Sequence, residues 1–391
     1  MRNKTSKKNT PLIATVLIVI VFLHLLPNGF ASDQGSDSIA PRPKGPNQKW
    51  RIAYLEGGSF FEFQLTLKAV VRGLMELGWL PKSELSNLQN TETVDLWSWL
   101  ARSTGSPFIE FVEDAYYTAE WDEKKQAAVK TSLIERLNKK KDIDLVIAMG
   151  TWAGYALANH DHSVPTLVFA STDPIGAGII KSVEDSGYDH IHARVDPERY
   201  DRQIRIFHDL IKFKKLGIVY DYDTVEGRSY AAVDTVERLG RELGFEIISC
   251  HAALTNVSLK EAEKEVFKCH EKLSPLVDAF YITEQGGGIT KENLPHLLAP
   301  LIEHHIPTFS QFGSEHVKRG VLLSVSQAEF KYIGKFHADT IAKVLNGAKP
   351  RDLDQLFEEP SKIAINLETA RLIGWNPPVD VVSAADDIYP H

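Results

Sequence analysis

The forty-one residues from Asp142 to Ser182, DIDLVIAMGTWAGYALANHDHSVPTLVFASTDPIGAGIIKS, decide the fold. Two nearly continuous apolar runs, 145–149 and 164–170, flank a short helical segment at 152–156. This pattern predicts a βαβ unit whose strands are buried on both faces of a parallel sheet. Open α/β sheets bind ligands beyond the carboxyl ends of their strands. That edge would carry the polar residues that follow each run, which are Thr151, Ser171, Thr172 and Asp173.

The same alternation of strand and helix continues along the chain in two series, with a break between Ser182 and Pro197. Further strands are expected near 50–55, 216–220, 245–250, 279–283, 306–309 and 321–325, and further helices near 62–78, 123–139, 199–210, 227–244, 259–273, 294–304 and 330–345. Residues 81–120 are less regular and rich in aromatic side chains. Two βα series indicate an α/β protein with two similar, Rossmann-like lobes built on parallel sheets.

The N-terminus is typical of a secretory signal peptide. A basic start precedes an apolar core from about Leu12 to Leu26, and small residues lead to an expected cleavage after Ala31. An uncleaved membrane anchor is the alternative, although the core is short for a span of about 20 residues. Residues 32–49 are rich in Ser, Asp, Pro and Gly, which predicts a flexible leader. The protein is therefore expected in the periplasm or outside the cell.

The composition fits a globular protein of two lobes. Of 391 residues, 43% are hydrophobic and 25% are charged, and the formal net charge is −8. An acidic chain argues against nucleic acid and against an anionic membrane surface as partners. We expect a monomer.

The two cysteines, Cys250 and Cys269, could pair in an oxidising compartment. Cys250 ends a predicted strand, and a helix that returns from that strand end would carry Cys269 several turns away. The spacing therefore favours two buried thiols over a disulfide, with the disulfide left open.

Candidate ligand-binding residues are those that follow the predicted strands. They combine aromatic rings, hydroxyls, amides and a few charges, as a small-molecule pocket requires. The full set is Glu56, Ser59, Phe60, Thr151, Trp152, Ser171, Thr172, Asp173, Tyr220, Asp221, Tyr222, Arg228, Ser229, Thr283, Glu284, Gln311 and Phe312.

These candidates suggest how an amino acid would bind. Its carboxylate would lie at the helix start near residues 227–229. Its ammonium group would pair with Asp173, Asp221 or Glu284, and an aromatic side chain would stack on a ring. The candidate rings are Phe60, Trp152, Tyr222 and Phe312. Each residue also has a simpler structural interpretation: Asp173-Pro174 as a turn, Trp152 and Tyr220 as packing, and Arg228 as a surface charge.

Metal and catalytic sites are not supported by the pattern. The clusters 160–162 and 303–305 contain His and acidic residues, but neither has a zinc-binding spacing, and both fall in charged stretches expected at the surface. No Gly-x-Ser-x-Gly motif and no phosphate-binding loop occur, and we expect neither a cofactor nor an enzymatic activity.

Several segments together resemble the extracytoplasmic solute-binding proteins of ABC transporters, in the branch that includes tryptophan- and tyrosine-binding proteins. The resemblance spans roughly residues 50–380, and its most specific part is 172–174, within Thr-Asp-Pro-Ile-Gly-Ala-Gly. Other matching segments are 165–169, 217–221, 306–308, 320–324 and 362–370. The region 87–119 departs from the family by being longer and more aromatic, and the loop 285–288 is unusual.

The resemblance implies two hinged lobes, as in type I periplasmic binding proteins, that close on a small molecule. Lobe 1 is expected to comprise residues 50–185 and about 313–348, and lobe 2 residues 186–312 and about 349–391, with the chain end passing back between the lobes. The implied function is delivery of a solute, such as an aromatic amino acid, to an ABC permease. A ligand sensor of the same fold that partners a membrane receptor, and an exported hydrolase, are the alternatives.

Overall fold

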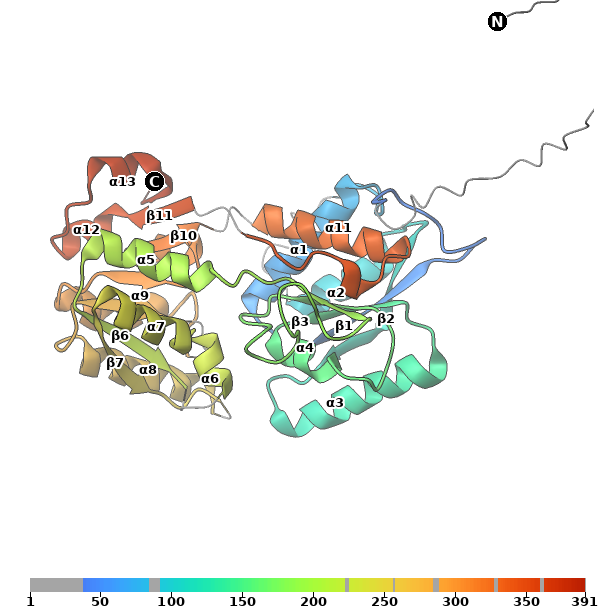
Figure 1. The fold of residues 1–391 in the computed structure, drawn as a ribbon, viewed down its shortest axis with the longest axis horizontal. Coiled ribbons are helices and arrows are strands. Elements are labelled where there is room, and N and C mark those ends of the chain that lie inside the picture. The colour runs from blue at the N-terminus through green and yellow to red at the C-terminus, as the bar shows by residue number, and fades with distance from the viewer. Residues whose placement is uncertain are drawn as a thin grey trace, which may run out of the picture. The chain divides into compact units, whose positions relative to one another are not determined.

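A computed structural model describes residues 38–83, 92–221, 225–255, 257–283, 288–326, 330–358 and 362–390. These residues form one compact unit, in which two separate sheets each organise a lobe (Figure 1). The predicted signal peptide, residues 1–31, lies outside the described residues. No helix in the described part of the chain is both long and apolar enough to cross a membrane.

The first lobe is built on a five-stranded parallel sheet with the order β2-β1-β3-β4-β5. Its strands are β1 (Trp50–Glu56), β2 (Ile109–Thr118), β3 (Leu145–Met149), β4 (Thr166–Phe169) and β5 (Ile191–Ala193). Successive side chains of a strand point to opposite faces, so Ile52 and Tyr54 enter one apolar core while Ala53 and Leu55 enter another. Both faces are therefore buried, as the continuous apolar runs predict.

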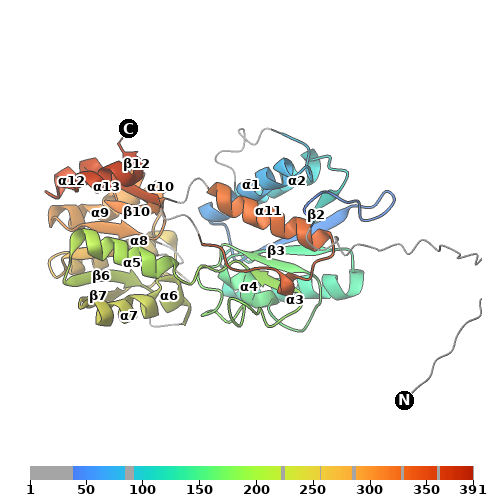
Figure 2. The ribbon, with the colours of Figure 1, turned by 45° about the horizontal axis from the view of Figure 1, so that its top comes forward.

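Helices cover both faces of this sheet. One face packs against α1 (Phe61–Glu76), α2 (Thr93–Ser103) and α11 (Lys331–Leu345), the other against α3 (Glu123–Glu135), its π-helical extension η2 (Arg136–Lys140) and α4 (Thr151–Leu157). Figure 2 shows α11 lying beside α1, although more than 250 residues separate them in sequence. Gly73 and Gly334 allow this approach, because a Cβ on Gly334 would lie 2.6 Å from the Ala69 backbone.

The second lobe contains a seven-stranded sheet with the order β12-β11-β10-β9-β8-β6-β7. Its strands are β6 (Lys215–Tyr220), β7 (Glu246–His251), β8 (Ala279–Ile282), β9 (Thr308–Ser310), β10 (Leu323–Ser326), β11 (Lys362–Asn366) and β12 (Ala385–Tyr389). Strands β6 to β10 are parallel, and β11 joins β10 in the antiparallel direction.

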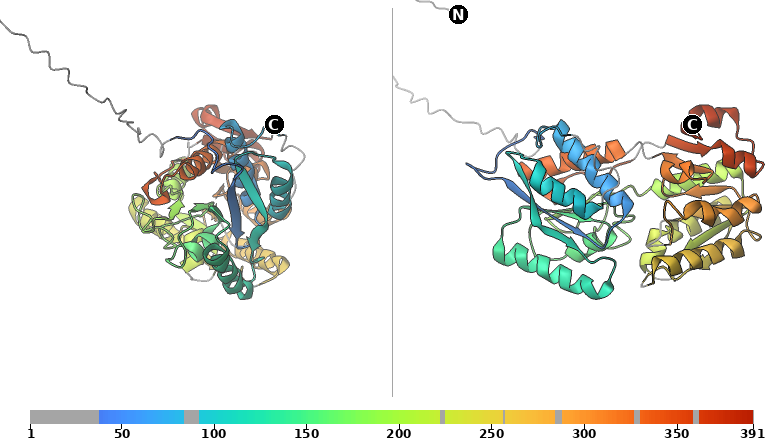
Figure 3. Two further views of the ribbon diagram at one scale, coloured as in Figure 1. Left: turned by 90° about the vertical axis from the view of Figure 1, so that its right-hand side faces the viewer. Right: turned by 180° about the vertical axis from the view of Figure 1, so that it is seen from behind.

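The second sheet is also covered on both faces, as the two outer layers of helices in Figure 3 show. Its helices are α5 (Arg199–Ile211), α6 (Val225–Tyr230), α7 (Val233–Leu243), α8 (Leu259–Leu273), α9 (Leu294–Glu303), α10 (Ser314–Lys318), α12 (Leu367–Leu372) and α13 (Val379–Ala384). The expected helix 227–244 is in fact the pair α6 and α7. The predicted fold class, an α/β protein with two parallel-sheet lobes, is confirmed.

The two lobes repeat one topology. In both, the second strand in sequence lies at an edge beside the first, and the third lies on the first strand's other side: β2-β1-β3-β4-β5 matches β7-β6-β8-β9-β10. The strand order reverses direction at β1/β3 and at β6/β8, and such a switch point opens a crevice at the carboxyl ends of the strands.

Two segments that connect the lobes pair with each other. Residues 194–198 lead from β5 to α5, and residues 346–358, which include η4 (Pro350–Asp352), follow α11. The Val195 amide donates to the Gln355 carbonyl (2.8 Å), and the Phe357 amide donates to the Val195 carbonyl (3.0 Å). The connections therefore run as a short parallel ladder.

The described residues depart from the sequence-based picture in three places. Residues 93–118 form α2 and β2, which the irregular pattern concealed because the register between β1 and β2 shifts at Ile52/Tyr54. Strand β5 pairs within the first sheet, although the first segment expected for lobe 1 ends at residue 185. Strand β10 pairs within the second sheet, although residues 313–348 are expected in lobe 1. The chain end does not pass back between the lobes, because β11 and β12 extend the second sheet.

The preference for two free thiols was also wrong, because Cys250 and Cys269 form a disulfide with their Cα atoms 5.6 Å apart. The connection 252–258 runs beyond the end of β7 before α8 turns back. Cys269 is ten residues into α8, about 15 Å at the helical rise, and this returns it level with Cys250.

Candidate functional site

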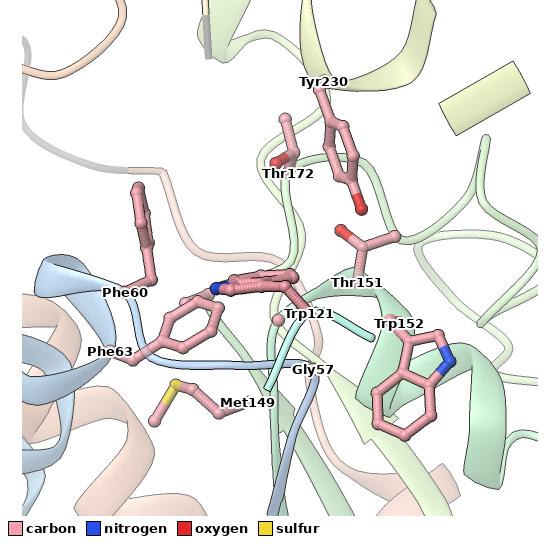
Figure 4. A pocket seen from close by; sticks show the side chains of 11 residues that line it. Gly57, Phe60, Phe63, Trp121, Met149, Thr151, Trp152, Thr172 and Tyr230 are labelled. Atoms are coloured by element: carbon pink, nitrogen blue, oxygen red, sulfur yellow. The ribbon is translucent and has the colours of Figure 1, made fainter. Parts of the chain in front are cut away.

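A hollow lies at the carboxyl ends of β1, β3 and β4, at the switch point of the first sheet. Figure 4 shows its lining from close by. Most of the lining comes from the first lobe, and α6 of the second contributes one ring. The lining residues are Gly57, Phe60, Phe63, Trp121, Met149, Gly150, Thr151, Trp152, Ala170, Thr172 and Tyr230.

Trp121 lies across the hollow and is fixed by the β1–α1 loop. Its amide donates to the Gly57 carbonyl (2.8 Å), and its indole Nε1 donates to the Ser59 carbonyl (3.0 Å). Glu120 and Trp121 both adopt left-handed backbone conformations, with φ of 53° and 58°. Such conformations are strained in residues other than glycine, and they concentrate at ligand sites.

Phe63 packs beside Trp121 because Gly150 leaves room for it. The centroids of the two rings are 6.4 Å apart. A Cβ on Gly150 would lie 2.6 Å from the Phe63 ring, and the φ of Gly150 is 86°. Glycine therefore serves two needs here, a left-handed turn from β3 into α4 and space for an aromatic wall.

Hydroxyl groups lie on the other side of Trp121. In Figure 4, Thr151, Thr172 and Tyr230 are on the opposite side of the indole from Phe63 and Met149. Thr151 begins α4, and its Oγ1 lies 3.2 Å from the Oγ of buried Ser171. A hydroxyl can donate and accept at once, so this side can bind a polar edge of a ligand.

Glu56 lies beneath the hollow and does not line it. The residue is 1% exposed, and its carboxylate accepts hydrogen bonds from the Tyr116 hydroxyl (2.6 Å) and the Tyr54 hydroxyl (2.9 Å). Burial raises the pKa of the Glu56 carboxyl, and these hydrogen bonds oppose that rise. Glu56 therefore joins β1 to β2 under the site.

Among the described residues, no charged side chain lines the hollow. The two described acids predicted to hold an ammonium group are engaged elsewhere. Asp173 accepts a hydrogen bond from the Gly176 amide (2.8 Å), and Asp221 accepts from the Leu254 amide (3.4 Å) and from the Thr255 hydroxyl.

Of the candidate residues from the sequence, the structure brings Phe60, Thr151, Trp152 and Thr172 together around the hollow. Ser171 lies just behind Thr151. Tyr222 and Glu284 fall outside the described residues. Contact of any candidate with a ligand stays a prediction.

Most of the remaining candidates have structural partners. The Ser59 hydroxyl bonds to Glu92, and the Thr283 hydroxyl donates to the Val219 carbonyl. Arg228 of α6 pairs with Asp234 and Glu237, whereas the buried Oγ of its neighbour Ser229 has no hydrogen-bond partner among the described residues.

Three candidates of the second sheet are buried. Tyr220 packs against His251, with ring centroids 4.6 Å apart. The Gln311 carbonyl accepts from Arg199. Phe312 stacks on His316 at 4.4 Å, and its centroid lies 6.3 Å from that of Phe60.

Sequence reasoning missed Gly57, Phe63, Trp121, Met149, Gly150, Ala170 and Tyr230 as lining residues. The aromatic richness around Trp121 was a signal, but the hidden strand β2 is what delivers this residue to the edge of the sheet. Phe63 and Met149 lie inside regular elements, where the sequence predicts only core packing.

Within the described ranges, no group of three or more His, Cys, Asp or Glu side chains could hold a metal ion. The interpretation of residues 160–162 as surface was wrong for His162, which is 5% exposed and packs on His190 with ring centroids 4.5 Å apart.

Residues 109–388, most of the chain, match the family model described as ABC transporter substrate binding protein. A tyrosine-binding protein of Clostridioides difficile (strain R20291) is 24% identical over 232 residues, 59% of this chain and 63% of that relative. The chain thus matches less than two thirds of that relative's length.

Solved structures share the fold. An ABC domain in complex with L-Trp from Streptococcus pneumonia has a TM-score of 0.64 at 20% identity, covering 87% of this chain and all of the other. A conserved domain protein from Vibrio cholerae gives 0.64 at 18% identity with the same coverage. A ligand-free, open substrate binding protein from Clostridium difficile gives 0.57 at 18% identity, covering 87% and 98%. The chain belongs to the ABC transporter substrate binding protein family.

Proposed function

We propose that this protein, exported after removal of residues 1–31, binds a small solute, such as an aromatic amino acid, and delivers it to an ABC permease. The observation that carries the proposal is the aromatic hollow at the β1/β3 switch point. A concave, mostly apolar site with a few polar groups at this position is the usual arrangement for a small ligand in an α/β fold.

The ladder between the connecting segments supports closure as the mechanism. Because Val195 pairs with Gln355 and Phe357, the described connections can bend together while each sheet stays rigid. Tyr230 of α6 reaches the hollow, and Phe312 lies near Phe60, so the second lobe supplies part of the enclosure. A solute that contacts both lobes would favour the closed state.

The first experiment is a thermal-shift screen of residues 32–391, refolded to remove any carried ligand, against amino acids, sugars, nucleosides, peptides and organic acids. A true ligand at 100 times its Kd should stabilise the folded state by about 2.7 kcal/mol. A shift with one chemical class supports solute binding, and isothermal titration then gives the Kd. The absence of a shift with every class argues against the proposal.

Delivery is tested in cells. Uptake of the labelled solute should fall when the chain is deleted and recover when it is restored. A protein that binds the solute but leaves uptake unchanged would instead act as a sensor, the alternative with the same fold.

A further inference from the structure

The side chain of Trp121 is exposed to solvent although its polar groups are bonded to the protein. The residue is 44% exposed, among the large apolar side chains least covered by the fold, although both its amide and its indole N–H have backbone acceptors. Its polar atoms are satisfied, so its remaining free surface is the π face. An indole face held at the floor of a hollow is a surface for stacking.

The β1–α1 loop holds this ring in one place. A Cβ on Gly58 would lie 2.5 Å from the indole, and one on Gly57 would lie 3.1 Å from it. The two glycines therefore let the ring lie flat on the loop backbone. Together with the left-handed turn at Glu120 and Trp121, this contact fixes the indole before any ligand arrives.

The rest of the lining selects for the same kind of ligand. Phe60 provides apolar contact, Phe63 and Met149 support the other side of the indole, and Thr151, Thr172 and Tyr230 provide hydroxyls. Among the described lining residues there is no charge to bind an ammonium or a carboxylate group. This half of the site is therefore suited to an uncharged, flat moiety with a polar edge.

We infer that Trp121 is the stacking platform that selects a solute with a planar aromatic ring, and that Gly57 and Gly58 are the positioning residues for it. The inference rests on the proposed function and names its substrate class. The ring lies on the indole face, and its hydrogen-bonding edge faces the hydroxyl side. A branched aliphatic solute of similar size gains no such contact.

The test is isothermal titration of the wild-type protein with L-tryptophan, indole, L-leucine and glycine betaine. We expect the two indole compounds to bind and the other two to bind up to about tenfold more weakly, since an aromatic pair adds about 0.5–1.5 kcal/mol beyond burial. Trp121→Ala should weaken indole binding by about tenfold, and Trp121→Phe should keep most of it. Glycine betaine is included because aromatic faces also attract methylated ammonium groups.

Two further variants test whether Trp121 stacks on the ligand or only supports the fold. Gly58→Val keeps the indole but displaces it, and it should weaken indole binding as much as Trp121→Ala does. Tyr155→Ala removes an aromatic ring that is 63% exposed on α4 and outside the lining, and it should bind as the wild type does. Unfolding without ligand verifies that each variant folds.

The results distinguish this inference from the proposed function. Equal indole affinity in folded Trp121→Ala overturns the platform, as does preferred binding of leucine or betaine, while solute binding itself stands. If no indole compound binds but another class in the broad screen does, the aromatic selection is wrong and the function survives. If no class binds, both fail.

Discussion

The two sheets share one strand order, but the side chains at the carboxyl ends of their strands differ. At the first sheet, the strand ends leave an aromatic hollow with Trp121 across it. At the second, the described strand-end side chains are tied to the protein itself: Tyr220 to His251, Asp221 to Thr255, and Thr283 to Val219. Topology therefore locates a potential site in each lobe, but local hydrogen bonding decides which side chains remain available to a ligand.

Acid should destabilise both lobes and is the largest effect that we expect. Burial lowers the pKa of several histidines, to about 4 for His162 and His192 in the first lobe and to about 4 for His270 and about 3 for His316 in the second. Their ordinary value is 6.5, so the unfolded chain takes up protons first as the pH falls. Stability is thus full above about pH 6.5 and is lost progressively towards pH 4. Thermal unfolding between pH 7.5 and 4.5 measures this loss.

One histidine tests whether the first lobe loses stability before the second as the pH falls. His337 on α11 is fully buried, its ring centroid lies 3.7 Å from that of Phe169, and burial with Arg194 and His192 nearby lowers its pKa. His337→Leu should flatten the pH dependence more than His270→Leu does. A wild-type melting temperature that stays constant from pH 7 to 4.5 would refute the whole prediction.

The disulfide lies in the second lobe, so its removal should destabilise the second lobe and leave the first unchanged. Cys250 and Cys269 are 19 residues apart, and closing a loop of this length contributes about 3 kcal/mol. The double variant Cys250→Ala/Cys269→Ala should lower the free energy of unfolding by about that amount. Urea unfolding of the oxidised wild type measures the reference. Reduction of the wild type should reproduce the loss, and a double variant as stable as the oxidised wild type would contradict it.

The first lobe depends instead on α11, a helix from the far end of the chain. Gly334→Val should push α11 off α1, because its Cβ would meet the Ala69 backbone, and overpacking of this kind costs about 2–3 kcal/mol. Lys335→Val, on the exposed side of the same helix, is the control for valine in α11: it loses some helix propensity and an exposed ion pair with Asp339 but meets no backbone. Equal stability of the two variants would show that the helices separate without cost.

The sequence was sufficient where burial alone sets the pattern. The apolar runs 145–149 and 216–220 predicted β3 and β6 and with them the α/β fold, whereas the family came from the resemblance of several segments. It failed at β2, where a register shift breaks the alternation, and therefore at Trp121, which β2 delivers. It failed at the disulfide because the length of one connection sets the phase of α8 against β7. Such facts depend on three-dimensional register, which no local pattern encodes.

The same limit explains why the sequence singled out two acids as candidates to bind the ligand. Asp173 and Asp221 follow strands as ligand-binding acids do, yet each accepts hydrogen bonds from its own lobe. A position at the edge of a sheet is readable from the sequence, whereas the partner that a side chain chooses there is not.

The smallest effects should therefore come from Asp173→Ala and Asp221→Ala. Each should cost about 1 kcal/mol of stability through the lost backbone or hydroxyl hydrogen bonds, and neither should change the Kd for the solute by more than about twofold. Asp173→Asn keeps an acceptor for the Gly176 amide and should restore the stability. Titration of each variant with the solute found in the screen is the measurement. A large loss of affinity in Asp173→Asn at unchanged stability would mean that the carboxylate leaves its turn to meet a cationic group, and the uncharged first-lobe hollow would then be only part of what the ligand requires.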